Sequence, residues 1–213
     1  MLRKNNFDKI QLNNTSCFEL FDGSEGEKRV FLWGGKSKYA SVLSACNLKF
    51  LIETVDEWWE IELFFLAPIK DKKPLSVKLD IWVLHSNTKI NIVFVSFVQC
   101  DAPVEVNGSI FMEQWVAWSS ASLLEESVVL SNKVHIKNLP ILDIQAKNIQ
   151  ASHWAKIYRL DWDKLFYLES KWLDYQKAQE VLLSSFPERL FEGIEINEEE
   201  KEKLYTTYFT YSK

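Results

Sequence analysis

Three carboxylates in the first third of the chain have the types and spacing that chemistry would need. Glu60 and Glu62 alternate to the same side of one expected strand, and Glu53 lies on the strand before it. Acids gathered in a cleft can act as general acid and base. The solvated face of a β-sheet has the same composition, and we favour that interpretation because antiparallel sheets commonly expose one polar face.

A phosphate-binding loop is the second chemistry to test, because residues 30–37 end in Gly34, Gly35, Lys36 and Ser37. The P-loop pattern requires its first glycine where this chain has Val30. Without that glycine the backbone cannot curl around a phosphate. The segment therefore predicts a turn closed by two glycines, and we expect no cofactor and no cofactor-binding residues.

Metal binding and nucleophilic catalysis also lack a supporting pattern. The three histidines, His85, His135 and His153, stand apart, with no suitable ligand two to four residues away. Asp161 follows His153 but is better explained as the N-cap of a helix. The chain also has no G-x-S-x-G motif around a serine. We predict no catalytic residue and no metal ligand, and the sequence favours a protein that is not an enzyme.

The cysteines and the hydropathy pattern bear on the compartment. Cys17, Cys46 and Cys100 are an odd number without C-x-x-C spacing, which is typical of reduced thiols in a cytosolic protein. The first residues carry charge without a following apolar segment, and no apolar run reaches the length of a membrane span. We expect a cytoplasmic protein without a membrane as partner.

Charge and aromatic content indicate the kind of partner. The net charge of the 213 residues is −5, and the basic residues are spread along the chain, which disfavours nucleic acid as the main partner. Nine Trp, seven Tyr and fourteen Phe exceed the usual aromatic content, and Trp and Tyr suit surfaces that are half apolar and half wet. These properties favour another protein as the partner, one with a basic surface.

Strand patterns dominate residues 47–100. Apolar residues alternate with polar ones at period two, and short links interrupt the alternation. We interpret these links as hairpin turns, which predicts a four-stranded antiparallel meander with one shared apolar face. The predicted opposing pairs are Ile52 with Ile61, Phe50 with Leu63, Val83 with Ile92, and Ile81 with Phe94.

A helical period replaces the strand period near Asp161. Leu165, Leu168, Trp172 and Tyr175 begin a stripe of three- and four-residue steps, which predicts one amphipathic helix of about six turns ending before Pro187. The expected fold class is α+β, with an antiparallel sheet, either a sandwich or a curled sheet, and this long C-terminal helix packed on it. We place a β-rich domain at residues 1–148 and a helical region of the same domain at 149–213.

The functional hypothesis is a protein-interaction module, such as an inhibitor, an immunity-type partner or an accessory subunit of a larger assembly. Its predicted partner-binding residues are Glu53, Trp58, Glu60 and Glu62, an aromatic anchor beside acids that would steer a basic partner. The alternative is a carrier of a small molecule or lipid, with an apolar cavity between sheet and helix. Binding of an apolar dye by the folded monomer would favour the carrier. The oligomeric state is left open.

Overall fold

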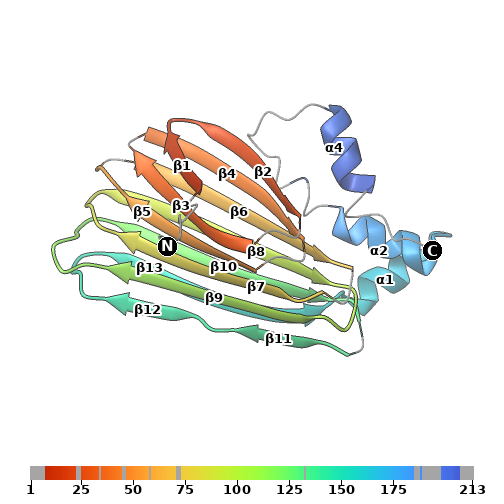
Figure 1. Cartoon of the computed structure of the whole chain (residues 1–213). Coiled ribbons are helices and arrows are strands. Elements are labelled where there is room, and N and C mark those ends of the chain that lie inside the picture. Colours follow the sequence, from red (N-terminus) through yellow and green to blue (C-terminus); the bar gives the residue numbers. More distant parts are fainter. Residues whose placement is uncertain are drawn as a thin grey trace, which may run out of the picture.

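Two parallel β-sheets face each other, and short helices lie beside one end of them (Figure 1). The computed structural model describes residues 8–22, 25–33, 35–44, 47–57, 59–70, 73–131, 133–184, 188 and 198–206.

Successive strands alternate between the two sheets. One sheet contains β1 (Asp8–Asn13), β3 (Glu25–Trp33), β5 (Asn47–Thr54), β7 (Leu75–Val83) and β9 (Pro103–Met112), and its last edge is shared by β11 (His135–Asn138) and β12 (Ile141–Ile144). The other contains β2 (Ser16–Asp22), β4 (Gly35–Ser44), β6 (Trp59–Ile69), β8 (Thr88–Val98), β10 (Ser120–Val129) and β13 (Gln150–Arg159). We call these the odd sheet and the even sheet.

Each pair of consecutive strands forms one coil of a flattened β-solenoid. β5 pairs in parallel with β7, and β6 pairs in parallel with β8, so each strand stacks on the strand two places later in the chain. Parallel neighbours need a long connection between them, and here the intervening strand of the opposite sheet supplies it. Cross-strand hydrogen bonds accordingly join residues about one coil apart, as from Ser96 to Ser127, 31 residues later.

The predicted antiparallel meander is therefore wrong, and so is the α+β class built on it. The strands lie where the alternation placed them, but Ile52 pairs with Ile81 and Ile61 with Ile90, not with each other. The link around Asp56 turns the chain from one sheet into the other, whereas a hairpin would return it beside the strand it left. Both connections leave the same alternation of apolar residues, so the pattern did not separate them.

The core fills the space between the two sheets. Phe50 and Phe65 are fully buried, and their ring centroids lie 4.9 Å apart across the two sheets. Phe65 also stacks on Phe94 of the next coil, at 6.3 Å. These alternating residues belong to a single large hydrophobic cluster, but they come from two facing sheets, so the expectation of one apolar face shared by four strands of one sheet was wrong.

Short helices replace the long one that was predicted. α1 (Trp162–Glu169) and α2 (Tyr175–Leu183) are separate, and α4 spans Glu198–Leu204. Asp161 caps α1 as predicted, accepting hydrogen bonds from the backbone N–H groups of Asp163 and Lys164. The single helix was wrong because Trp172 has a left-handed φ of 68° and Asp174 caps a new helix at Lys177.

A second, smaller core lies on the outer face of the even sheet. Leu183 of α2 packs with Val42, Leu66, Val95 and Phe97, all buried. The helices thus cover the apolar end of that face, where the strands finish (Figure 1). None of the helices in the described residues is long and apolar enough to cross a membrane.

The proposed boundary between residues 148 and 149 stays a prediction. β13 begins at Gln150 and pairs along its whole length with β10, so the region after that boundary starts with a strand of the even sheet.

Candidate functional site

The acidic residues predicted from the sequence lie on two different faces. Glu60 and Glu62 belong to β6 of the even sheet, while Glu53 belongs to β5 of the odd sheet. The inward positions of both strands are apolar, so these carboxylates face outward from opposite sheets. Trp58 lies outside the described residues. The structure does not bring the predicted group together, and its role in binding a partner stays a prediction.

Each of the two acids on β6 is paired with lysine. Glu60 accepts from Lys89 at 2.6 Å and lies 3.2 Å from the Nζ of Lys36, and Glu62 lies 2.8 Å from the Nζ of Lys38. Hydrogen bonds from Lys89 and Lys36 lower the pKa of Glu60, and the carboxylate in turn raises the pKa of Lys89. These are solvated cross-strand ion pairs, as expected for the polar outer face of a β-sheet.

A glutamate–histidine pair lies inside the solenoid. His153 Nε2 on β13 and Glu125 Oε1 on β10 are 3.1 Å apart, and their side chains are 1% and 0% exposed. Buried ionisable groups are costly to retain and cluster at functional sites. This pair is the best candidate for a functional group in the described part of the chain.

Gly108 on β9 makes the room for this pair. A Cβ atom built on Gly108 would clash with the side chains of Leu123 and Glu125, and would lie 2.8 Å from Cε1 of His153. β9 belongs to the odd sheet, so this glycine faces the pair from across the core. The absence of a side chain at Gly108 therefore leaves space in the core for the side chains of Glu125 and His153.

The pair leaves two buried atoms unsatisfied. Glu125 Oε2 and His153 Nδ1 have no hydrogen-bond partner among the described residues. When Nε2–H donates to the carboxylate, the neutral imidazole keeps its lone pair on Nδ1. A histidine whose second nitrogen donates to a carboxylate is the usual arrangement of a metal-binding imidazole. The free Nδ1 can therefore accept a proton or bind a metal ion.

No preformed metal site surrounds this nitrogen. Across the described ranges, no three His, Cys, Asp or Glu side chains are grouped in a way that could hold a metal ion. Burial and the nearby Glu19 raise the pKa of the Cys17 thiol to about 11, so it is protonated at neutral pH and a poor ligand. Any metal bound here would need ligands from outside this set.

Sequence reasoning missed Glu125 and discounted His153. The available signal was parity: Ala121, Leu123 and Glu125 occupy alternate positions of one apolar run, which aims the carboxylate into the core. The partner could not be found the same way, because residues 149–213 were expected to form a helical region and the register of β13 beside β10 is set by the coil.

Exposed apolar side chains gather on two parts of the surface. One is the last coil, which forms an edge of both sheets within the described part of the chain and exposes Leu139, Ile141, Leu142, Trp154, Ile157 and Tyr158. The other is the pair α1 and α2 with the turn between them, which exposes Trp162, Phe166, Tyr167, Trp172 and Tyr175. Soluble proteins usually cover such areas with a partner.

A known family matches residues 47–186, described as SUF system FeS cluster assembly, SufBD core domain. The chain belongs to this family. The match runs from β5 to α2 and contains both Glu125 and His153.

Three curated proteins resemble parts of this SufBD-family chain. The iron-sulfur cluster assembly SufBD family protein slr0076 of Synechocystis is 30% identical over 52% of this chain and 24% of its own length. The iron-sulfur cluster assembly protein SufD of Escherichia coli is 26% identical over 41% and 21%. The chloroplastic protein ABCI7 of Arabidopsis thaliana is 29% identical over 40% and 18%. The matched stretches thus span no more than about a quarter of these relatives.

The family match overturns the function expected from the sequence. The predicted interaction module, whether an inhibitor, an immunity-type partner or an accessory subunit, and the predicted lipid or small-molecule carrier both conflict with membership of the SufBD family. They were inferred from the absence of catalytic motifs and from surface aromatic residues, and neither property is specific to a class of protein.

Proposed function

We propose that this protein is a component of the SUF system that assembles iron-sulfur clusters. The observation that carries the proposal is the family match across residues 47–186, which covers most of the solenoid. The relatives that bear on it are named as iron-sulfur cluster assembly proteins. In this proposal the cluster is the cargo of the assembly system.

The buried pair gives the proposal a chemical centre. Imidazole nitrogen and carboxylate oxygen both bind iron, and Nδ1 of His153 and Oε2 of Glu125 are unpartnered. β13 is the last strand of the even sheet, so His153 lies on the coil nearest the free end. We propose that a cluster, or the iron that forms it, meets His153 when this end opens against a partner.

Partner proteins are part of the same proposal. Among the described residues β12 and β13 are edge strands, and the apolar side chains of the last coil are exposed beside them, which suits docking of another protein's strands. A cytosolic location, and a basic partner at Glu53, Trp58, Glu60 and Glu62, remain proposals. The last coil is the stronger candidate because its apolar residues are exposed together, whereas Glu60 and Glu62 already pair with lysines.

Purification of the tagged chain from its own cells under anaerobic conditions would test the proposed function. Other SUF proteins should co-purify with it, together with iron and acid-labile sulfide. Deleting the gene should lower the activity of iron-sulfur enzymes in the same cells. Recovery of the chain without SUF proteins, iron or sulfide, and without an effect of the deletion, would contradict the proposal.

A double variant of the last coil tests which surface binds the partner. Trp154→Lys and Ile157→Lys place charges on side chains that are 64% and 54% exposed, so the fold should tolerate both changes. Loss of the SUF proteins from this double variant would assign the docking surface. Loss from Glu60→Lys and Glu62→Lys instead would assign it to the acidic face.

A further inference from the structure

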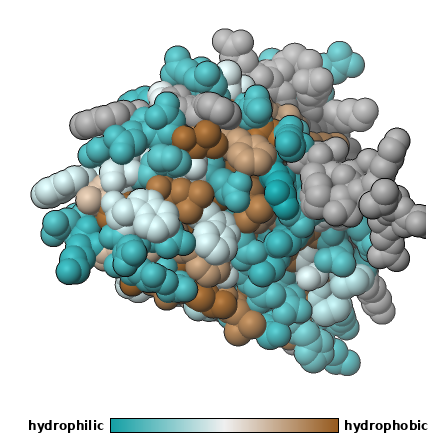
Figure 2. All heavy atoms as spheres, turned by 60° about the vertical axis from the view of Figure 1, so that its left-hand side comes forward, coloured by the Kyte–Doolittle hydropathy of each residue, from teal (hydrophilic) through white to brown (hydrophobic). Residues whose placement is uncertain are grey.

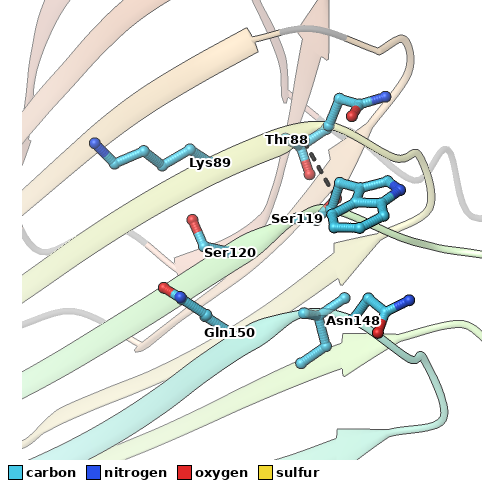
Figure 3. Close-up of a pocket in the computed structure, with 9 residues that line it drawn as sticks. Thr88, Lys89, Ser119, Ser120, Asn148 and Gln150 are labelled. Carbon is cyan, nitrogen blue, oxygen red and sulfur yellow. Dashed lines mark hydrogen bonds between the residues drawn. The ribbon is translucent and has the colours of Figure 1, made fainter.

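A groove of about 560 Å³ lies where three coils turn into the even sheet (Figure 3). It is lined by residues 87–89, 118–120 and 148–150, which are the first positions of β8, β10 and β13 and the corners before them. Lys89, Ser120 and Gln150 stand in register across the three strands. The groove is thus a repeated structure, built from equivalent positions of successive coils.

Trp118 is unusual among the three corner residues. Asn87, Trp118 and Asn148 have φ angles of 58°, 55° and 55°, in the left-handed region. Asparagine adopts this conformation readily, whereas a bulky residue there is strained. The side chain of Trp118 is also 73% exposed, so core packing does not account for a tryptophan at this corner.

Polar groups with unused hydrogen-bonding capacity surround the indole. Backbone hydrogen bonds join the corners of successive coils, as from Trp118 N–H to the carbonyl of Asn148. Thr88 N–H also donates to Ser119 Oγ at 3.2 Å (Figure 3). In contrast, the side chains of Asn87, Ser120, Asn148 and Gln150 make no hydrogen bond to any other described residue. Three amides and a hydroxyl therefore offer both donors and acceptors to a ligand.

The charge of the groove excludes one class of ligand. Lys89 is the charged residue of the lining, and its ammonium is 2.6 Å from Glu60. The groove has no surplus positive charge for a phosphate. Apart from Trp118 and Ile149, the residues that line the groove are polar, so a lipid is not favoured. Figure 2 shows hydrophobic and hydrophilic side chains mixed over one face of the molecule.

We propose that this groove binds a neutral sugar ring. The C–H face of a sugar can lie on the exposed indole of Trp118, while its hydroxyl groups, each both donor and acceptor, meet the amides and Ser120. Neighbouring strands lie about 4.8 Å apart. Asn87 and Asn148, one coil to either side of Trp118, are therefore spaced to contact both edges of a ring lying on the indole. This site is separate from the buried pair and does not depend on the proposed function.

Saturation-transfer NMR on the full chain tests the proposal. The probes are glucose, galactose, N-acetylglucosamine, maltose and cellobiose at millimolar concentration, with adenosine as a planar ligand of another class. At least one saccharide should receive saturation from the protein, and adenosine should not. Failure of every saccharide, or transfer to adenosine alone, would overturn the proposal.

Trp118→Asn is the decisive variant because it removes the indole and leaves at this corner the residue found at both neighbouring corners. It relieves the left-handed strain, so the variant should fold at least as well as the wild type. Its saccharide affinity should fall about tenfold or more. Unchanged affinity would overturn the proposal.

Trp172→Asn provides the matched control. Trp172 is 98% exposed and has a φ of 68°, but it lies in the turn between α1 and α2, away from the groove. This variant removes an equally strained, exposed indole and should leave saccharide affinity unchanged. Equal losses in both variants would show nonspecific contact with surface tryptophan and would also overturn the proposal.

Discussion

Glu60 and Glu125 both belong to the even sheet, and each pairs with a basic side chain of the next strand. The two pairs differ in their exposure to solvent. Glu60 pairs with Lys89 at 2.6 Å on the outer face, where its side chain is 30% exposed. Glu125 pairs with His153 at 3.1 Å in the interior, where its side chain is completely buried. The outer pair is available to water and salt, whereas the inner pair has unsatisfied atoms and a glycine opposite that makes its space.

This difference shows where a solenoid keeps its chemistry. Outward positions repeat from coil to coil, and charges there form ladders that contribute little individually. Inward positions are filled by apolar side chains, so a retained acid and base must offset their desolvation or serve a function. Acids clustered at outward positions of the strands therefore indicate solvated ion pairs. A charged residue at an inward position, among apolar residues, indicates a candidate functional site.

The largest expected effect comes from breaking the inner pair. Glu125→Leu or His153→Leu alone leaves its partner buried and unpaired, which should lower the free energy of unfolding by about 3 kcal/mol. Making both substitutions together should restore most of that loss. Urea denaturation of the two single variants and the double variant measures this coupling, and additive losses would show that the two side chains do not interact.

A smaller loss is expected from filling the space opposite the pair. Gly108→Ala places a methyl group against Leu123, Glu125 and His153, and should cost about 2 kcal/mol of unfolding free energy. Gly26→Ala is the comparison, because a Cβ there meets no atom within 4 Å but the residue has a φ of 151°, so this variant shows the cost of backbone strain without a clash. Thermal unfolding compares them. Equal stability of Gly108→Ala and the wild type would contradict the described packing.

The smallest effect is expected at the outer pair. The folded-state pKa of Glu60 is lowered by Lys89 and Lys36, so its stabilising contribution is present above the unfolded pKa and is lost as the pH falls through the folded pKa. Glu60→Gln should therefore be slightly less stable than the wild type at neutral pH, and the two should converge in acid. Denaturation at both pH values, at low and high salt, would detect the difference. A gap that widens in acid would contradict the assigned pairing.

The sequence could predict the local features of the fold because they depend on short-range patterns. Alternation located the buried faces of β5 to β8, and an aspartate before a helical pattern located the start of α1. The arrangement of the sheets was beyond those patterns, because a link that crosses to the opposite sheet and a hairpin link have the same length and polarity. No sequence repeat marked the coils, since their equivalent positions share burial and not residue identity, as Leu63 and Ile92 do.

The candidate site depended on that missing arrangement. Glu125 and His153 are 28 residues apart, a separation that becomes a contact only when one coil lies on the next. Gly108 belongs to the opposite sheet, and its relation to the pair follows from the coil as well. Once the coil is known, inward parity identifies both side chains.

The double variant Glu125→Leu with His153→Leu, purified from its own cells as a complex, tests the central claim most directly. Because the two leucines compensate each other in the core, the variant should fold and retain the SUF proteins that accompany the wild type. The account predicts that the iron and acid-labile sulfide in the purified variant complex fall to the background measured in a mock purification from a strain that lacks this chain. Wild-type amounts of both in a folded, complexed double variant would contradict it.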